Sequence, residues 1–411
     1  MHCNSTNHWQ RNLIVCLFGS FTTVFAMTLI LPFLPIYIEQ LGVEGHDSIV
    51  QWSGIAYSAT FLAAGLVALL WGRLGDRYGH KLMLVSASLG MALTMALMGL
   101  STNIWQFVGL RLLAGVAGGY SSTAAFLVAV QTPKARSAWA LGLLSSGVMA
   151  GNLLGPLIGG VLPPLIGIRA TFWGAGALIF IAFLATALLV REAPRASSTD
   201  RHQTRAGWSQ IPQRGVVVAM LLTGMLLMIA NMSVEPIITI YVATLIEDPA
   251  RITLIAGLAM SATASGSLLS ASQLGKVADT IGHAKVIILA LAAAGLLLIP
   301  QAFVTEGWQL LAMRFLMGLA LGGLLPCIAT IIRHNVPDHS VGMITSCSLC
   351  SQFAGQVAGP LIGGFIGGQL GMRAVFLGTG IMLFAGSACN WRALGLSERG
   401  RGVSSSSSSR Q

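Results

Sequence analysis

Apolar runs of membrane-spanning length recur along almost the whole chain, and they restrict its fold more than any other feature. A helix needs about 20 predominantly apolar residues to cross the hydrocarbon core of a bilayer. Of the 411 residues, 55% are hydrophobic and only 9% are charged, whereas a soluble domain carries roughly 25% charged residues. The sequence therefore predicts an all-α polytopic membrane protein and excludes a water-soluble globule.

Twelve helical spans can be assigned from these runs. We predict them at residues 13–38, 53–71, 82–101, 105–130, 138–163, 170–190, 215–243, 253–274, 286–303, 308–332, 341–367 and 374–391. Most connections are short, but residues 191–214 hold five arginines together with Pro, Ser and Gly. We interpret this segment as a linker between two six-helix bundles, at 13–190 and 215–391, preceded by an N-terminal segment at 1–12. Residues 392–411 contain a serine run and are predicted to be a disordered tail.

Lysine and arginine are distributed unevenly between the two sides of the predicted membrane domain. By our assignment, 18 of the 23 fall on the side of the linker and both termini, and three fall on the opposite side. Cytoplasmic loops of membrane proteins carry an excess of basic residues. We therefore expect residues 1–12, 191–214 and 392–411 to be cytoplasmic. The net charge of +10 reflects this topology, and we expect no nucleic-acid partner, because the basic residues do not form one solvated face.

The chain contains an internal repeat of about half its length. Residues 72–80 recur in modified form at 275–283, a shift of 203, and residues 155–160 recur letter for letter at 359–364, a shift of 204. Three further patterns recur in order with one of the same two shifts. Each half contains six predicted spans and begins on the same side of the membrane. The sequence therefore predicts two parallel repeats, an arrangement used by transporters that move two bundles around a midplane site.

Four motifs in the first half resemble those of the major facilitator superfamily, in its 12-span drug:proton antiporter branch. They are Leu31-Pro-x-x-Pro35, Gly72-x-Leu-Gly-Asp-Arg-x-Gly-x-Lys81, Arg111-x3-Gly115 and Gly147-x3-Gly151-x3-Gly155-Pro156-x2-Gly159-Gly160. The similarity extends from the first predicted helix to the last. It implies a major facilitator fold and a bacterial inner-membrane exporter that exchanges drugs for protons by alternating access.

The resemblance assigns a gating role to the loop after the second span. The residues concerned are Gly72, Gly75, Asp76, Arg77, Gly79 and Lys81, with Asp279 as a weaker counterpart in the second half. Glycine permits the tight turn, and Asp76 can pair with a nearby arginine or cap a neighbouring helix. The alternative is a helix connector without a role in gating.

The fifth span carries the motif that the resemblance associates with antiport. It consists of Gly147, Gly151, Gly155, Pro156, Gly159 and Gly160. Glycines four residues apart line one helix face and permit close approach of a second helix, and proline bends the helix. The resulting contact could slide between transport states or serve packing alone, and both readings are compatible.

Three charged residues are predicted to lie inside spans. Arg111 and Arg314 are basic residues well within their helices, and Glu235 is a carboxylate placed just before Pro236. Charges at membrane depth are costly and mark functional sites by default. Arg111 is expected to hold carbonyl groups of the first helix or to act on a nearby acid, whereas Arg314 has either a functional or a structural role. Glu235 is a candidate for proton coupling or cation recognition, and a solvated interfacial glutamate is the alternative.

A substrate cavity is expected between the two halves. We propose its lining from aromatic, Met and amide side chains, namely Phe21, Met27, Tyr37, Tyr57, Phe61, Tyr120, Asn152, Asn231, Met232 and Gln352. Such surfaces accept varied apolar ligands, although core packing or lipid contact is the alternative for each residue.

The expected function is export of small amphiphilic drugs or toxic compounds, driven by protons, by a monomer surrounded by membrane lipid. The alternative is proton-coupled import or export of a sugar or organic anion, to which Arg111 and Arg314 would be suited. We expect no enzyme activity, because no P-loop, H-E-x-x-H, Gly-x-Ser-x-Gly or intramembrane carboxylate pair is present. For the same reason no cofactor, metal or ATP site is predicted.

Overall fold

The computed structural model describes residues 6–192, 211 and 213–407, and its secondary structure in these ranges is helical. The first half contains α1 (Thr6–Leu29), η1 (Leu31–Phe33), α2 (Leu34–Gln40), α3 (His46–Tyr78), α4 (His80–Met98), α5 (Ile104–Val116), α6 (Tyr120–Gln131), η2 (Lys134–Arg136), α7 (Ser137–Ile166) and α8 (Ile168–Leu189). The second half contains α9 (Arg214–Val234), η4 (Glu235–Ile237), α10 (Ile238–Ala243), α11 (Pro249–Ile281), α12 (His283–Gln301), α13 (Gly307–Leu321), α14 (Leu324–Asn335), η5 (Asp338–Ser340), α15 (Val341–Leu370) and α16 (Met372–Ser407).

These elements make up twelve membrane spans. Eleven helical segments in the described ranges are long and apolar enough to cross a bilayer. The twelfth span is α15, a helix of 30 residues whose many glycines and glutamines lower its mean hydropathy. The predicted fold class, twelve helices in two six-helix repeats, is therefore confirmed.

Four spans are interrupted where the sequence analysis predicts continuous helices. The first and seventh spans contain one 3₁₀ turn each, η1 and η4, and Pro32 and Pro236 lie at the starts of these turns. Proline has no backbone N–H and cannot continue the α-helical ladder. The fourth and tenth spans break at glycine pairs, between α5 and α6 and between α13 and α14. The breaks occupy matching places in the two halves and thus follow the repeat.

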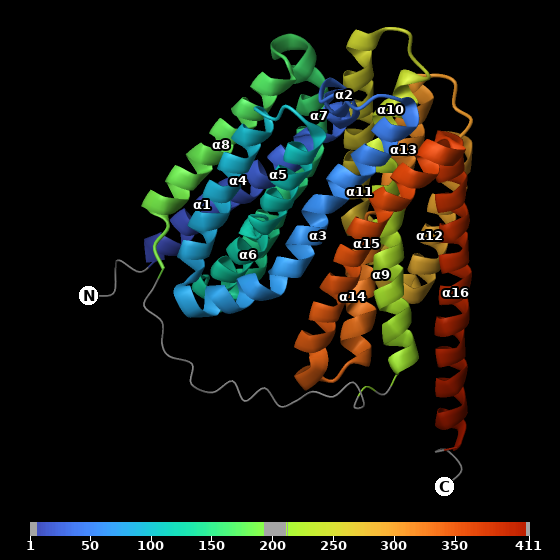
Figure 1. The fold of residues 1–411 in the computed structure, drawn as a ribbon. Helices are drawn as coiled ribbons and strands as arrows, with labels where there is room; N and C mark the ends of the chain where they lie inside the picture. Colours follow the sequence, from blue (N-terminus) through green and yellow to red (C-terminus); the bar gives the residue numbers. More distant parts are fainter. Residues whose placement is uncertain (1–5, 193–210, 212, 408–411) are drawn as a thin grey trace.

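The two halves lie side by side, with α1 to α8 in one bundle and α9 to α16 in the other (Figure 1). We name the two ends of the molecule by the chain. The linker end holds the end of α8 and the start of α9, and the far end holds the connections from α2 to α3 and from α10 to α11. The predicted linker at 191–214 lies mostly outside the described residues, which end at 192 and resume at 211 and 213.

The closest backbone contacts between the halves are made by parts of the helices that lie toward the far end. The α3 helix packs on α15, where a methyl group on Gly54 would overlap the Pro360 carbonyl oxygen. The α7 helix packs on α11, where the Thr253 hydroxyl donates to the Gly160 carbonyl at 2.9 Å. Glycine permits this close approach because it has no Cβ. The far end is therefore where the halves are joined in this conformation.

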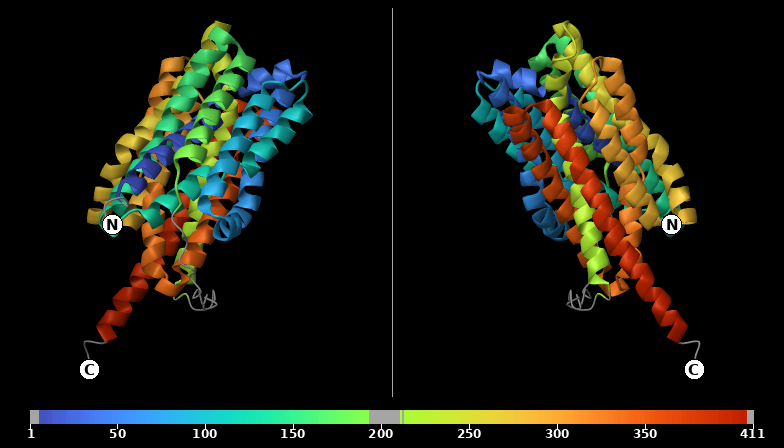
Figure 2. Two further views of the ribbon diagram at one scale, coloured as in Figure 1. Left: turned by 90° about the vertical axis from the view of Figure 1, so that its left-hand side faces the viewer. Right: turned by 90° about the vertical axis from the view of Figure 1, so that its right-hand side faces the viewer.

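The last helix is longer than expected. The sequence analysis predicts a disordered tail from residue 392, whereas α16 continues to Ser407 and projects beyond the other helices (Figure 2). Extending an existing helix needs no new nucleus, and no proline interrupts the chain between 372 and 407. Residues 408–411, which include the end of the serine run, lie outside the described residues.

Candidate functional site

Glu235 lies at the break in the seventh span, directly after α9 and at the first position of η4. Its side chain is partly buried and faces the first half of the molecule. The Tyr57 hydroxyl, from α3, donates to Glu235 Oε2 at 3.1 Å. A carboxylate from one half therefore accepts a hydrogen bond from a tyrosine of the other half, at the end where the halves meet.

Tyr57 is held in place by aromatic and cationic neighbours. Its side chain is buried, and its ring packs edge-on against Phe61 with ring centroids 5.1 Å apart. The Arg111 guanidinium carbon lies 5.6 Å from the centroid of the Tyr57 ring, within the range of a cation–π contact. These contacts fix the direction of the hydroxyl that reaches Glu235.

Arg111 links α5 to α3. Its side chain is 1% exposed, and Arg111 Nε donates to the Ala56 carbonyl at 3.2 Å. One turn further along α5, a methyl group on Gly115 would overlap the Thr60 carbonyl oxygen. The spacing Arg111-x3-Gly115 therefore lets α5 approach α3 closely and hold one of its carbonyl groups. The expectation that Arg111 holds carbonyl groups of the first helix is wrong for this bond, since the acceptor lies on the second span.

Arg314 is the repeat counterpart of Arg111 but has a different environment. Its side chain is 3% exposed, and within the described part of the chain Nε and Nη2 have no hydrogen-bond partner. The guanidinium carbon lies 5.9 Å from the centroid of the Phe376 ring. Glu235 is close enough to interact with it electrostatically. We call Glu235, Tyr57, Arg111 and Arg314 the Glu235 cluster.

The Glu235 cluster has the groups needed to couple a proton to a change of shape. An ionised Glu235 carboxylate attracts Arg314 and accepts the hydrogen bond from Tyr57. A neutral carboxyl group attracts Arg314 only weakly. A proton on Glu235 would therefore alter a contact that joins the two halves. Three of these residues are predicted intramembrane charges, and the fourth, Tyr57, is a predicted cavity residue.

The loop assigned to gating contains a single non-helical residue, Gly79, which connects α3 to α4 and has a φ of +102°. Its neighbours are held by Glu192, just after α8. The Glu192 carboxylate accepts hydrogen bonds from the backbone N–H groups of His80 and Lys81, both at 3.0 Å. Glu192 Oε1 also lies 3.3 Å from Nδ1 of the His80 ring.

Glu192 therefore caps the first turn of α4, where backbone N–H groups have no partner within the helix. Partial burial favours the neutral acid, but the hydrogen bonds from Lys81 and His80 outweigh it and hold the pKa of Glu192 below its usual range. Glu192 is not among the site residues predicted from the sequence. The available signal was an acidic residue directly after a span, in a segment otherwise rich in arginine.

The other predicted gating residues are placed as follows. Arg77 is exposed and its guanidinium carbon lies 5.3 Å from the Tyr78 ring centroid. Asp279 is 74% exposed and lies 3.6 Å from His283 Nε2 in the matching loop of the second half. Gly75 is buried at the end of α3. The side chains at 72, 73 and 76 lie outside the described part of the structure, so the predicted pairing of Asp76 stays a prediction.

The glycines of the antiport motif pack against two helices. Four of these glycines face α1, namely Gly147, Gly151, Gly155 and Gly159. A Cβ added at any of them would overlap the backbone or a side chain of α1. The Thr28 hydroxyl donates to the Gly151 carbonyl at 3.1 Å across this contact. Gly160 and the Pro156 carbonyl instead face α11 of the other half, opposite Thr253 and Gly257. The motif thus joins α7 both to its own bundle and to the partner bundle.

The predicted cavity residues do not form one surface. Tyr37 and Tyr120 are buried in the core of the first half, where the Tyr37 hydroxyl donates to the Met98 carbonyl at 2.5 Å and the Tyr120 hydroxyl lies 2.8 Å from that of Thr186. Both were assigned to the cavity, and both instead satisfy their hydroxyls within their own bundle. Asn152 is exposed, and the partly buried members are Phe21, Met27, Phe61, Asn231, Met232 and Gln352.

Comparison with known proteins agrees with this architecture. The profile of the Major Facilitator Superfamily matches residues 16–249 and 252–410. The "Multidrug resistance protein MdtG" of Salmonella typhimurium is 42% identical over 390 residues, covering 94% of this chain and 96% of that protein. The protein of the same name from Proteus mirabilis is 39% identical over 386 residues, with the same two coverages.

Two solved structures share the fold at low identity. A bacterial homologue of the human lysosomal transporter Spinster, in an inward-facing and unoccupied conformation, matches with a TM-score of 0.74 and 14% identity, covering 94% of this chain and 97% of that one. The nucleoside transporter NupG matches with a TM-score of 0.73 and 14% identity, covering 93% and 99%. The chain thus belongs to the Major Facilitator Superfamily and is a multi-pass membrane transporter rather than an enzyme.

Proposed function

We propose that this transporter is a monomer that exports amphiphilic drugs or toxic compounds across the bacterial inner membrane in exchange for protons. The relatives named as multidrug resistance proteins, about 40% identical over nearly the full chain, support this substrate class. The asymmetric distribution of lysine and arginine supports a cytoplasmic linker end. The chain carries no P-loop motif, so an ion gradient is the proposed energy source.

The observation that carries the proposal is the hydrogen bond from Tyr57 to Glu235 across the two halves. When Glu235 is ionised, the charge strengthens this bond and attracts Arg314. A proton on Glu235 would neutralise the carboxylate and weaken both interactions. The protonation state of Glu235 would thereby bias the balance between the joined and the separated arrangements of the far end.

Alternating access requires the other far-end contacts to break together with this bond. They include the Thr239 hydroxyl donating to the Pro32 carbonyl at 3.0 Å and the Ser261 hydroxyl donating to the Leu153 carbonyl at 2.7 Å. Each is a single hydrogen bond to a backbone oxygen, and such a bond contributes only about 1 kcal/mol net. A change at a charged group is therefore large enough to shift the balance between the two arrangements.

The test is transport in inverted membrane vesicles with an imposed pH gradient and a cationic dye as substrate. We expect Glu235→Gln to abolish dye accumulation driven by the gradient while leaving exchange down a dye gradient intact. Glu39→Gln is the matched control, because Glu39 is an exposed acid near the far end, and it should transport like the unmodified protein. Normal gradient-driven accumulation by Glu235→Gln would exclude Glu235 from coupling.

Transport of an organic anion is a second candidate, and the environment of Arg314 favours it. Among the described residues, the Nε and Nη2 atoms of this buried side chain have no hydrogen-bond partner, and a carboxylate or phosphate could accept from them. The same vesicles distinguish the two functions if an anionic compound is offered beside the dye. Saturable transport of the anion that is lost in Arg314→Gln, without dye transport, would replace the drug-export proposal.

A further inference from the structure

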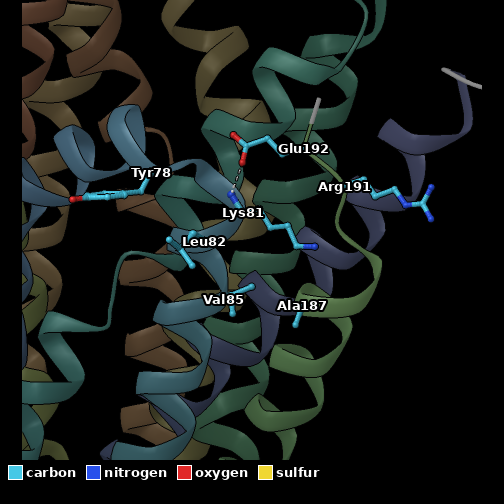
Figure 3. A pocket seen from close by; sticks show the side chains of 7 residues that line it. All are labelled: Tyr78, Lys81, Leu82, Val85, Ala187, Arg191 and Glu192. Atoms are coloured by element: carbon cyan, nitrogen blue, oxygen red, sulfur yellow. Dashed lines mark hydrogen bonds between the residues drawn. The ribbon is translucent and has the colours of Figure 1, made fainter. Parts of the chain in front are cut away.

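An open groove lies between α4 and α8 at the linker end, outside the Glu235 cluster. It has a volume of about 660 Å³, and the residues that line it are Tyr78, Lys81, Leu82, Val85, Ala187, Arg191 and Glu192 (Figure 3). The Lys81 side chain extends toward α8 above Val85 and Ala187, and Arg191 extends outward at the rim. The groove therefore has an apolar floor and a basic edge.

The depth of the groove follows from the lengths of the two helices. At 1.5 Å per residue, the 19 residues of α4 span about 28 Å, close to the thickness of the hydrocarbon core. Lys81 is the second residue of this helix, and Arg191 follows the last residue of α8, Leu189, by two positions. Both cations thus lie at the boundary between hydrocarbon and headgroups, and the apolar floor lies on the hydrocarbon side.

The charges of the groove are arranged to favour an anion at its edge. The Glu192 carboxylate accepts from the backbone N–H groups of His80 and Lys81, so its charge is directed at the start of α4. Within the described part of the chain, no ion pair or hydrogen bond engages the Lys81 ammonium or the Arg191 guanidinium. The carbonyl of Arg191 accepts from Asn12 Nδ2 at 2.7 Å, which fixes the backbone at the rim.

We propose that this groove binds one anionic phospholipid. The phosphate lies against Lys81, with Arg191 at the rim, and an acyl chain follows Leu82, Val85 and Ala187 into the membrane. Basic residues at membrane-facing grooves on the cytoplasmic side recognise such headgroups, and apolar burial holds the chain. This site is distinct from the proposed transport site and does not depend on the identity of the exported compound.

The test uses the full chain, purified in a neutral detergent and titrated with phosphatidylglycerol or with phosphatidylcholine of the same acyl chains. Bound lipid is counted by native mass spectrometry. We expect one phosphatidylglycerol to bind more tightly than any phosphatidylcholine. Each basic residue near a membrane surface contributes about fivefold, so Lys81→Gln/Arg191→Gln should weaken that binding about 25-fold. The control is Lys134→Gln/Arg136→Gln, which removes two exposed cations of η2 at the same end and should bind normally.

A second variant tests the acyl-chain part of the groove. Ala187→Trp places a large side chain on the floor of the groove and should also abolish tight binding of phosphatidylglycerol. This variant tests the proposal even if Lys81→Gln/Arg191→Gln fails to fold. Inorganic phosphate should not displace the lipid. Equal binding of the two lipids, retention of the tight site in Ala187→Trp, or displacement by inorganic phosphate would each overturn the proposal. The last result would indicate a site for small anions instead.

Discussion

The cap on α4 gives a prediction whose size can be worked out from the structure. Glu192→Ala removes the carboxylate that accepts hydrogen bonds from the His80 and Lys81 amides, both at 3.0 Å. These two amides lie in the first turn of α4, where no helical carbonyl is available to them. Their protection from solvent therefore depends on Glu192, and the change should be confined to this turn.

A hydrogen bond to a charged acceptor contributes about 1.5–3 kcal/mol net. The Glu192 side chain is 21% exposed, so solvent screening places each bond near the lower end of this range. A loss of about 1.5 kcal/mol corresponds to roughly tenfold faster opening. We therefore expect amide exchange at His80 and Lys81 to accelerate about tenfold in Glu192→Ala, and less in Glu192→Gln, which keeps a neutral acceptor.

Hydrogen–deuterium exchange with mass spectrometry on the detergent-solubilised protein measures this effect. The first turn of α12 provides an internal control, because it occupies the matching place in the second half. Asp279→Asn is the control variant, since Asp279 lies near the His283 ring and is largely exposed. Unchanged exchange at His80 and Lys81 in Glu192→Ala would refute the assignment of Glu192 as the cap.

The same cap should depend on pH. The pKa of Glu192 is held below its usual value of 4.5 in the folded protein, so the folded state binds this proton less tightly than the unfolded state. Its stabilising contribution is fully present above about pH 4.5 and is lost as the pH falls through the folded pKa. Exchange at the first turn of α4 should accelerate in that acidic range, and Glu192→Gln should remove the acceleration.

Three further predictions concern the helices of the transport core. Tyr57→Phe removes only the hydrogen bond to Glu235. Without a pH gradient it should raise the labelling of cysteines introduced at the far end about tenfold, and unchanged labelling would contradict the prediction. Gly159→Ala should destabilise by roughly 1–3 kcal/mol, because the added methyl overlaps the carbonyl of Leu29, whereas Gly174→Ala, with nothing within 4 Å, should be neutral or stabilising in thermal unfolding. Arg111→Gln should destabilise more than Arg314→Gln in the same assay, because Arg111 Nε donates to the Ala56 carbonyl, whereas Arg314 Nε has no hydrogen-bond partner among the described residues; the reverse order would contradict the role given to the Ala56 carbonyl.

The positions of spans and the internal repeat could be predicted from the sequence because they depend on local hydropathy and spacing. Pro32 and Pro236 mark two of the breaks, but apolar runs continue across both prolines, and hydropathy therefore predicts continuous spans. Membrane helices tolerate such breaks where neighbouring groups satisfy the freed backbone atoms. Whether the freed backbone groups find partners depends on neighbouring helices, and the apolar sequence of one span does not show it.

The candidate site was predictable only in part. The sequence predicts Arg111, Arg314 and Glu235 as candidate site residues, because few charged side chains lie inside the predicted spans. Hydropathy does not show which face of a helix meets which neighbour, so the sequence predicts Tyr37 and Tyr120 in a cavity, whereas both lie in a packed core. The link between Tyr57 and Glu235 joins residues 178 positions apart, and only the packing of the halves brings them together.

The repeat also explains why the Glu235 cluster needs residues from both halves. Each half keeps an arginine followed four residues later by a glycine, and Gly115 and Gly318 pack on equivalent helices, against the Thr60 and Thr263 carbonyls. The halves differ at the residues around these arginines. With the repeat shifts of 203 and 204, Met260 stands where the first half has Tyr57, and Leu31 stands where the second half has Glu235. Each half therefore supplies a group that the other lacks, and the hydrogen bond must cross the interface. In the proposed mechanism a proton at this bond would act on the contact between the halves, because the repeat has diverged at these positions.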